Sequence, residues 1–366
     1  MEDIVTSLAK RFLPQMSKEE RREAIESLKK LIDEEFFNMY CEDRPESDRV
    51  RCPRCGSRHV VEKGHDADGS QRCLCRSCLR TFTARTNKVF STTKLDRATW
   101  MEFAECHVDV LSLRETAQRC SVSLKTAFFM RHRILECMAQ SMPVFRSAAG
   151  DEMQIDECYF RESFKGDRRN APYDIPRKAR HRSFGRDNCE EICVLTGIND
   201  VGDLFFELAG CGSITRERAV RYLEGKIASG TIVATDKAHA YRNLVKTFDL
   251  RRHTSRHSKE HAVNKVNALH ARIKEFIRGF HGVSTRRLWN YLAWFKWIWS
   301  FGYSRTAKET AGLVIKQAGL NPYRTTWRNY KSTPYPFYDY WVKQAGRDAL
   351  ARKGLGMNYE VMSKAG

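Results

Sequence analysis

The chain has 366 residues, more than one ordinary compact domain requires, and its 64 lysines and arginines exceed its 45 aspartates and glutamates by 19. This excess favours a polyanionic partner, with nucleic acid ahead of an acidic membrane surface. The most apolar stretch, 289–303, contains Lys296 and is shorter than the ~20 residues of a membrane span. Thirteen cysteines, an odd number, with no apolar leader behind a basic start, argue against a secreted disulfide scaffold and favour metal ligation in a reducing cytoplasm.

The apolar periodicity divides the chain into five segments. Residues 1–48 are predicted to be a helical lead-in with Ser17 and Glu20 as a capping box, and residues 49–90 are rich in cysteine. Residues 91–145 are helical up to Pro143. Residues 146–305 contain predicted strands at 153–158, 192–198 and 204–208, followed by a helix at 215–228. Strands at 231–235 and 250–253 follow, with a helix at 238–244 between them, and then helices at 261–280 and 285–301. This order predicts a mixed α/β layer, followed by an aromatic-rich C-terminal tail at 306–366.

Two C-x-x-C pairs in the second segment predict a structural zinc site. The pairs are Cys52 with Cys55 and Cys75 with Cys78, and the residues between them include glycines suited to hairpin turns. Cys73 is an alternative ligand, but only one residue separates it from Cys75, and the two-residue spacing chelates better. Four thiolates fill a tetrahedral Zn²⁺ site, so the segment is expected to be a zinc ribbon that holds one ion.

The third segment is expected to hold a helix-turn-helix between Ser112 and Leu135. A first helix contains Ala117, a turn follows at Ser121–Ser123, and a second helix starts near Leu124. The second helix has one apolar side and one polar side, as a helix in a DNA major groove does, although any helical hairpin could share the pattern. Its candidate DNA-binding residues are Lys125, Thr126, Arg131 and Arg133.

Two acids are predicted at strand positions of one sheet in the fourth segment. Asp156 lies in the first strand, and Asp236 directly follows the apolar run 232–235. A carboxylate on a buried strand is costly unless it binds a cation, so the pair favours Mg²⁺ or Mn²⁺. Asp236 alone could instead cap the next helix, an alternative that does not account for Asp156.

A polar stripe on the helix at 261–280 can face these acids. Asn267, His270 and Lys274 line one side, next to an apolar side that includes Val266 and Ile273. A solvated helix face is the alternative interpretation. The basic stretch 164–186, with Lys178, Arg180 and Arg182 among its cations, is a candidate phosphate-binding loop or a merely solvated one. The tryptophans of 289–299 are interpreted as core packing.

Taken in order, these features resemble the zinc-ribbon group of bacterial insertion-sequence transposases of the DDE superfamily, from about Cys52 to about Phe301. The segments that carry the resemblance are Cys52-Pro-Arg-Cys55, Cys78–Phe82, Ser112–Leu135, Ile155–Phe160, Val194–Ile198, Thr235–Tyr241, His261–His270 and Gly282–Thr285. Together they are specific, whereas few of them are specific alone.

The resemblance implies a multidomain protein with a zinc ribbon and a helix-turn-helix ahead of a ribonuclease-H-like catalytic domain at 146–305. Asp156 and Asp236 would hold metal, and the third catalytic position falls on Asn267, followed seven residues later by Lys274. An amide oxygen can bind Mg²⁺ but adds no negative charge, which departs from the three-carboxylate pattern. Glu157 and Glu260 are candidate substitutes.

The expected activity is metal-dependent phosphoryl transfer on DNA, with two Mg²⁺ or Mn²⁺ ions, that cleaves the ends of an insertion sequence and joins them to target DNA. Lys274 and His270 would contact DNA phosphate or orient the DNA end. Joining two ends implies at least a homodimer on DNA, in the bacterial cytoplasm at the nucleoid. The alternatives are a domesticated regulator that binds specific DNA without cutting it, and a nuclease without strand transfer.

Overall fold

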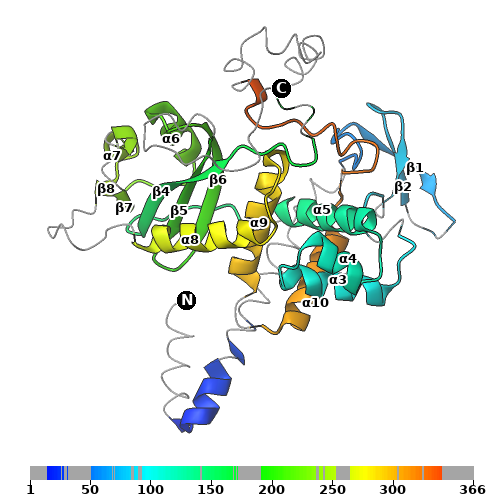
Figure 1. Ribbon diagram of the computed structural model, residues 1–366, viewed down its shortest axis with the longest axis horizontal. Coiled ribbons are helices and arrows are strands. Elements are labelled where there is room, and N and C mark those ends of the chain that lie inside the picture. Colours follow the sequence, from blue (N-terminus) through cyan, green and yellow to red (C-terminus); the bar gives the residue numbers. More distant parts are fainter. Residues whose placement is uncertain are drawn as a thin grey trace. The chain divides into compact units, whose positions relative to one another are not determined.

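The structure is a computed structural model, and it describes residues 15–25, 27–28, 31, 51–67, 69, 71–83, 86–89, 93–140, 142–167, 169, 171, 191–235, 239–241, 244–252, 264–302, 305–323 and 325–339. These residues form two compact units (Figure 1). The first unit combines the chain up to Met142 with Trp297–Arg324, and the second combines Pro143–Lys296 with the chain from Thr325. Residues 18–25 are helical, and Ser17 and Glu20 form the expected capping box through reciprocal side-chain bonds.

The first unit contains a small antiparallel sheet. Its strands are β1 (Val60–His65), β2 (Gln71–Cys75) and β3 (Thr81–Phe82), in the order β1-β2-β3. Gly69, in the turn between β1 and β2, and Gly64, at a register shift near the end of β1, adopt positive φ angles of 79° and 68°. Phe82 packs with Cys52 and Cys75 in the core of this sheet. Hairpin strands with two cysteine pairs at one end are the arrangement expected of a zinc ribbon.

The first unit also contains a group of helices, α3 (Arg97–Val108), α4 (Leu113–Arg119), α5 (Leu124–Gln140) and α10 (Ala307–Leu320). Side chains cap their N-termini: Asp96 caps α3, Ser112 forms a capping box with Glu115, and Thr306 forms one with Glu309. Helix α10 packs against α3 and α5. The prediction of a tail from residue 306 therefore needs correction, because its first part is an ordered helix of this unit.

The second unit is built on a five-stranded mixed sheet, in the order β6-β5-β4-β7-β8. The strands are β4 (Glu152–Arg161), β5 (Glu191–Asn199), β6 (Leu204–Cys211), β7 (Ile232–Thr235) and β8 (Arg251–Arg252). The first three pair antiparallel, whereas β7 is parallel to both β4 and β8. Strand β4 is therefore central, and its side chains reach both faces of the sheet.

Helices cover the two faces of this sheet (Figure 1). They are α6 (Arg216–Leu223), the short helix η4 (His239–Tyr241), α7 (Leu244–Thr247), α8 (Asn264–Arg278) and α9 (Thr285–Phe301). Met153 and Ile155 of β4 pack with residues of α6, η4 and α7 in one core cluster. Gln154, on the opposite face, accepts a hydrogen bond from Val266 N at the start of α8. The observed order of strands and helices is the one that the sequence predicts.

Several boundaries differ from the prediction, and β6, for example, continues three residues past the predicted run, to Cys211. Helix α6 ends at Leu223 rather than at residue 228, because Gly225 adopts a positive φ of 72° just beyond it. Strand β4 continues to Arg161, three residues past the predicted run. Among the residues described, no helix is long and apolar enough to cross a membrane.

Candidate functional site

The first candidate acid, Asp156, lies on the central strand next to the end of β7. In the parallel pairing of these strands, Ile155 stands opposite Thr235, the last residue of β7. Asp156 is the next residue of β4, and its side chain is 18% exposed. Asp236, the next residue after Thr235 in the sequence, lies outside the described residues. Carboxyl ends of parallel strands are where sheets of this kind hold their ligands.

A buried network ties Asp156 to α8. The hydroxyl of Thr196, which stands opposite Asp156 on β5, donates to the Asp156 backbone oxygen at 2.8 Å. The same hydroxyl lies 2.6 Å from His270 Nε2, and His270 Nδ1 lies 3.9 Å from Asp156 Oδ2. Thr196 is fully buried and His270 is 7% exposed. The sequence gives no signal for Thr196, because its role depends on the register of β4 and β5.

The structure changes the expected role of His270. Burial, and then the positive charge of Lys274, lower the pKa of His270 to about 4, so the ring is neutral at pH 7. A neutral ring that is buried against Thr196 does not offer its Nε2 to DNA. We therefore replace the predicted DNA contact of His270 with a structural role, in which His270 positions α8 and Asp156 relative to each other.

The other two residues of the predicted polar stripe on α8 are accessible. Asn267 and Lys274 are exposed, one turn before and one turn after His270. Residues at these spacings share a helix side, and the Lys274 charge acts on both His270 and Cys158 of β4. Asn267 and Lys274 therefore lie on the side of α8 that carries His270. Glu260 lies outside the described residues.

Glu157 points to the opposite face of the sheet. Successive residues of a strand alternate between faces, so Glu157 shares the side of Met153 and Ile155. Its Oε1 accepts a 2.6 Å hydrogen bond from the hydroxyl of Tyr241. Burial, and then the Glu157 charge, raise the pKa of Tyr241, which keeps this donor protonated. The suggestion that Glu157 could substitute for Asn267 needs correction, because a sheet separates the two side chains.

Four cysteines of the ribbon form a metal-binding cluster. The sulfur atoms of Cys52, Cys55, Cys75 and Cys78 all lie within 4.8 Å of one another. Two of the separations, Cys52–Cys78 and Cys55–Cys75, are 3.6 Å, close to the ~3.8 Å that tetrahedral zinc with ~2.3 Å bonds imposes. Hydrogen bonds from the backbone N–H groups of Cys78 and Ser77 lower the pKa of Cys75 to about 6, which favours a thiolate. The donor set fits Zn²⁺.

The choice of Cys75 rather than Cys73 as a ligand agrees with this geometry. Cys73 pairs with Glu62 and Phe82 inside the small sheet and is not a member of the four-sulfur cluster. The residues after Cys55 and Cys78, which are Gly56 and Leu79, both have positive φ angles, 76° and 56°. The two knuckles thus turn in the same way.

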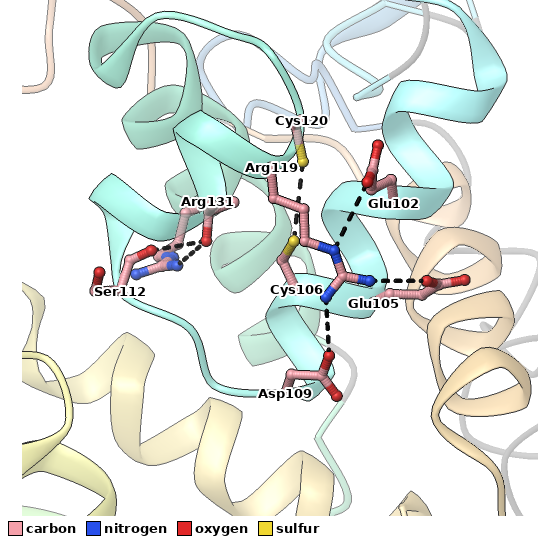
Figure 2. A network of polar contacts seen from close by, with 9 residues as sticks. Glu102, Glu105, Cys106, Asp109, Ser112, Arg119, Cys120 and Arg131 are labelled. Carbon is pink, nitrogen blue, oxygen red and sulfur yellow. Dashed lines mark hydrogen bonds and ion pairs between the residues drawn. The ribbon is translucent and has the colours of Figure 1, made fainter.

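Helices α4 and α5 lie where the sequence predicts the two helices of a helix-turn-helix, and buried polar contacts hold them together. Arg131 of α5 is 1% exposed, and its Nη2 donates to the Leu111 carbonyl and to the Thr116 hydroxyl. Figure 2 shows Arg131 inside this group of helices. The prediction that Arg131 contacts DNA needs correction, because its guanidinium is already used to hold α5 against α4.

An exposed ion network joins α4 to α3 (Figure 2). Arg119 lies 3.3–3.6 Å from three carboxylates, which are those of Glu102, Glu105 and Asp109. Lys125 is exposed and Thr126 half-buried at the start of α5, where Ser123 caps the helix. Arg133 is half-buried and lies over the ring of Tyr323 at 4.4 Å. Lys125 is the most accessible of the four predicted DNA-binding residues.

The predicted phosphate-binding loop is mostly outside the described residues, including Lys178, Arg180 and Arg182. Its first lysine, Lys165, has a structural role, because its Nζ donates to the carbonyls of Phe280, His281 and Gly282 just beyond α8. The interpretation of the tryptophans as core is confirmed for Trp294 and Trp297, which are fully buried, but Trp289 is 41% exposed.

Comparisons with known proteins agree with the fold of the second unit. Residues 149–300 match the model of the ISXO2-like transposase domain. An uncharacterized protein in the transposable element ISH50 of Halobacterium salinarum is 28% identical over 124 residues, which are 34% of this chain and 40% of that protein. The chain thus matches two fifths of that relative's length. The mixed sheet with its helices is consistent with a ribonuclease-H-like domain of the DDE type.

A solved structure, titled "Crystal structure of a pre-cleavage Mos1 transpososome", is 10% identical and aligns with 58% of this chain and 75% of that one, at a TM-score of 0.18. A TM-score this low does not relate the two folds.

Proposed function

We propose that the chain is a DNA transposase that cleaves the ends of an insertion sequence and joins them to target DNA. The observation that carries the proposal is Asp156, on the central strand of a domain that matches a transposase family, next to the end of the strand that leads to Asp236. Thr196 holds the backbone of Asp156, and the partly buried carboxylate lies 3.9 Å from His270 Nδ1, so a bound cation would offset the cost of burying this charge.

Asp156, Asp236 and Asn267 are the proposed ligands of the catalytic Mg²⁺ or Mn²⁺. Bound divalent ions supply charge neutralisation and activation of the attacking hydroxyl in phosphoryl transfer. Asn267 is exposed on the side of α8 that faces the Asp156 side of the sheet, and its amide oxygen suits a hard cation. Lys274, also exposed, would bind a DNA phosphate.

The first unit is proposed to bind the element ends. Lys125 and Thr126 stand at the N-terminal turn of α5, where recognition helices contact bases, and the zinc ribbon would add a second contact. Lys178, Arg180 and Arg182 are proposed to bind phosphates. Two ends must meet in one reaction, so at least two copies of the chain are expected to assemble on DNA.

The second candidate function is a DNA-binding regulator that no longer cuts. Asn267 favours it, because an amide in place of a carboxylate removes one negative charge from the proposed metal site. Asp156 argues against it, since a protein that only binds DNA gains nothing from a partly buried carboxylate next to the end of β7.

Strand joining on DNA that bears the element's own ends tests the proposal. Purified chain is incubated with a labelled duplex that ends in a free 3′-hydroxyl and with a supercoiled plasmid, in Mg²⁺, Mn²⁺ or EDTA. We expect joined products with either metal, none in EDTA, and none with Asp236→Asn. Tight, sequence-specific binding without joining in any metal would instead establish the regulator.

A further inference from the structure

An ordered turn in the C-terminal part of the second unit exposes a tryptophan beside two cations. This turn, Trp327–Lys331, follows Thr326, whose N–H donates to Asn329 Oδ1 at 2.6 Å. Tyr330 N in turn donates to the Thr326 carbonyl at 3.0 Å, which closes the turn. Trp327 is 58% exposed, and Arg328 and Lys331 are exposed as well. The turn lies in the segment that Figure 1 draws in orange-red.

A buried arginine fastens this turn to α9. Arg287 is 7% exposed, and its Nη2 donates to the Tyr330 carbonyl at 2.7 Å while its Nη1 donates to the Thr325 hydroxyl at 3.4 Å. Its neighbour Arg286 lies 4.2 Å from the centre of the Tyr335 ring. Placing a guanidinium inside a protein is costly unless its bonds are made, so the position of the turn is specified by the sequence.

The same anchor reaches the strand that carries Asp156. Where β4 ends, Ser163 and Thr285 exchange two 2.9 Å hydrogen bonds, which fix the start of α9 to the strand. Arg286 also pairs with Asp167 at 2.8 Å. The turn is therefore attached to the acid-bearing strand by a short series of contacts, all within the second unit.

The chemistry of the turn fits nucleic acid that has unpaired bases. Trp327 and Tyr330 have nearly parallel rings, 6.2 Å apart, and the Lys331 Nζ lies 5.9 Å from the Tyr330 ring centre. From Thr325 to Tyr338 the sequence has two cations and no acid. Aromatic faces beside cations bind single strands, because bases stack on the rings and phosphates pair with the cations.

We propose that the Trp327–Lys331 turn binds unpaired bases of the DNA next to the reacting end, with Trp327 as the stacking residue and Arg328 and Lys331 as phosphate contacts. The proposal rests on the proposed function only in its choice of DNA as the partner. A protein partner fits less well, because one exposed indole followed by two cations offers little of the apolar area of a protein interface.

The test measures DNA binding in EDTA, so that no strand is cut. Fluorescence anisotropy gives the Kd of the full chain for a dye-labelled duplex with a short single-stranded tail and for a blunt duplex of equal length. We expect Trp327→Ala to weaken binding to the tailed duplex about tenfold and to leave the blunt duplex unaffected within about twofold. Trp327→Phe should retain most of the preference.

Two further variants test whether the effect of Trp327→Ala comes from lost stacking rather than from lost charge or from the loss of any exposed tryptophan. Trp289→Ala removes another exposed tryptophan and should leave both Kd values unchanged. Lys331→Gln should weaken binding to the tailed duplex and lower its salt dependence by roughly one ion. A 2-aminopurine base in the tail should be quenched by the wild type and not by Trp327→Ala.

Equal affinities of wild type and Trp327→Ala for the tailed duplex would overturn the inference while leaving the proposed function in place. Loss of self-association of the free chain in Trp327→Ala, seen by sedimentation, would overturn it in favour of a second copy as the partner. If the wild type binds neither duplex, the proposed function itself fails.

Discussion

Replacing Thr196 with valine should destabilise the second unit, because the hydroxyl at this fully buried position serves two partners. It donates to the Asp156 carbonyl at 2.8 Å and lies 2.6 Å from His270 Nε2. Valine has nearly the same shape but forms no hydrogen bond. A lost hydrogen bond costs about 1 kcal/mol net, and a buried polar group left unsatisfied costs about 1–3 kcal/mol, so we expect a loss of about 2–4 kcal/mol.

Native-state hydrogen exchange of the β5 amides measures this loss in the second unit alone, which denaturation of a two-unit chain would not. Thr196→Ser is the matched control, because it keeps the hydroxyl and removes one methyl group, at a cost of about 1 kcal/mol. We expect the valine variant to be less stable than the serine variant. A valine variant as stable as the wild type would refute the role given to the hydroxyl.

Three further predictions concern the ribbon, the helix-turn-helix and a buried lysine. Cys75→Ser should abolish bound zinc, measured by elemental analysis, whereas Cys73→Ser should retain about one ion per chain, and equal zinc in both would contradict the ligand assignment. Arg131→Met should destabilise the first unit by about 3 kcal/mol and Arg119→Met by less than about 1 kcal/mol, because only Arg131 is buried. If denaturation shows similar losses of stability for the two variants, this difference in roles is wrong. Burial lowers the pKa of Lys296 to about 8, whereas its pKa in the unfolded chain is ~10.4. Between these pH values the unfolded state binds more protons than the folded state, so the free energy of unfolding rises with pH across this window, by an amount on the order of 3 kcal/mol. Lys296→Met should remove this rise, and denaturation curves at pH 7 to 10 that still show it would assign it to another group.

The periodicity of the sequence predicts most of the fold. The helix predicted at 285–301 is α9 to the residue, and the run 192–198 lies within β5, because buried elements keep their apolar pattern along their whole length. Helix α10 could also have been predicted, since Thr306 and Glu309 form a capping box of the same kind as the one predicted at Ser17 and Glu20.

The residues of the candidate site are harder to predict from the sequence than the fold is. Strand alternation alone separates Asp156 from Glu157, so the face of Glu157 could have been predicted. Thr196 could not, because its contact with Asp156 depends on the register of β4 and β5. Arg131 has the composition of a DNA contact, and only the packing of α5 on α4 shows that it is buried.

The most direct test of the central claim compares two adjacent carboxylates in the strand-joining assay. Asp156→Asn and Glu157→Gln each remove one negative charge from β4 with almost no change of shape, but from opposite faces of the sheet. The account predicts that Asp156→Asn abolishes joining in both Mg²⁺ and Mn²⁺ while still binding DNA, and that Glu157→Gln retains most of the wild-type rate. Joining by Asp156→Asn at the wild-type rate, or an equal loss in both variants, would contradict it.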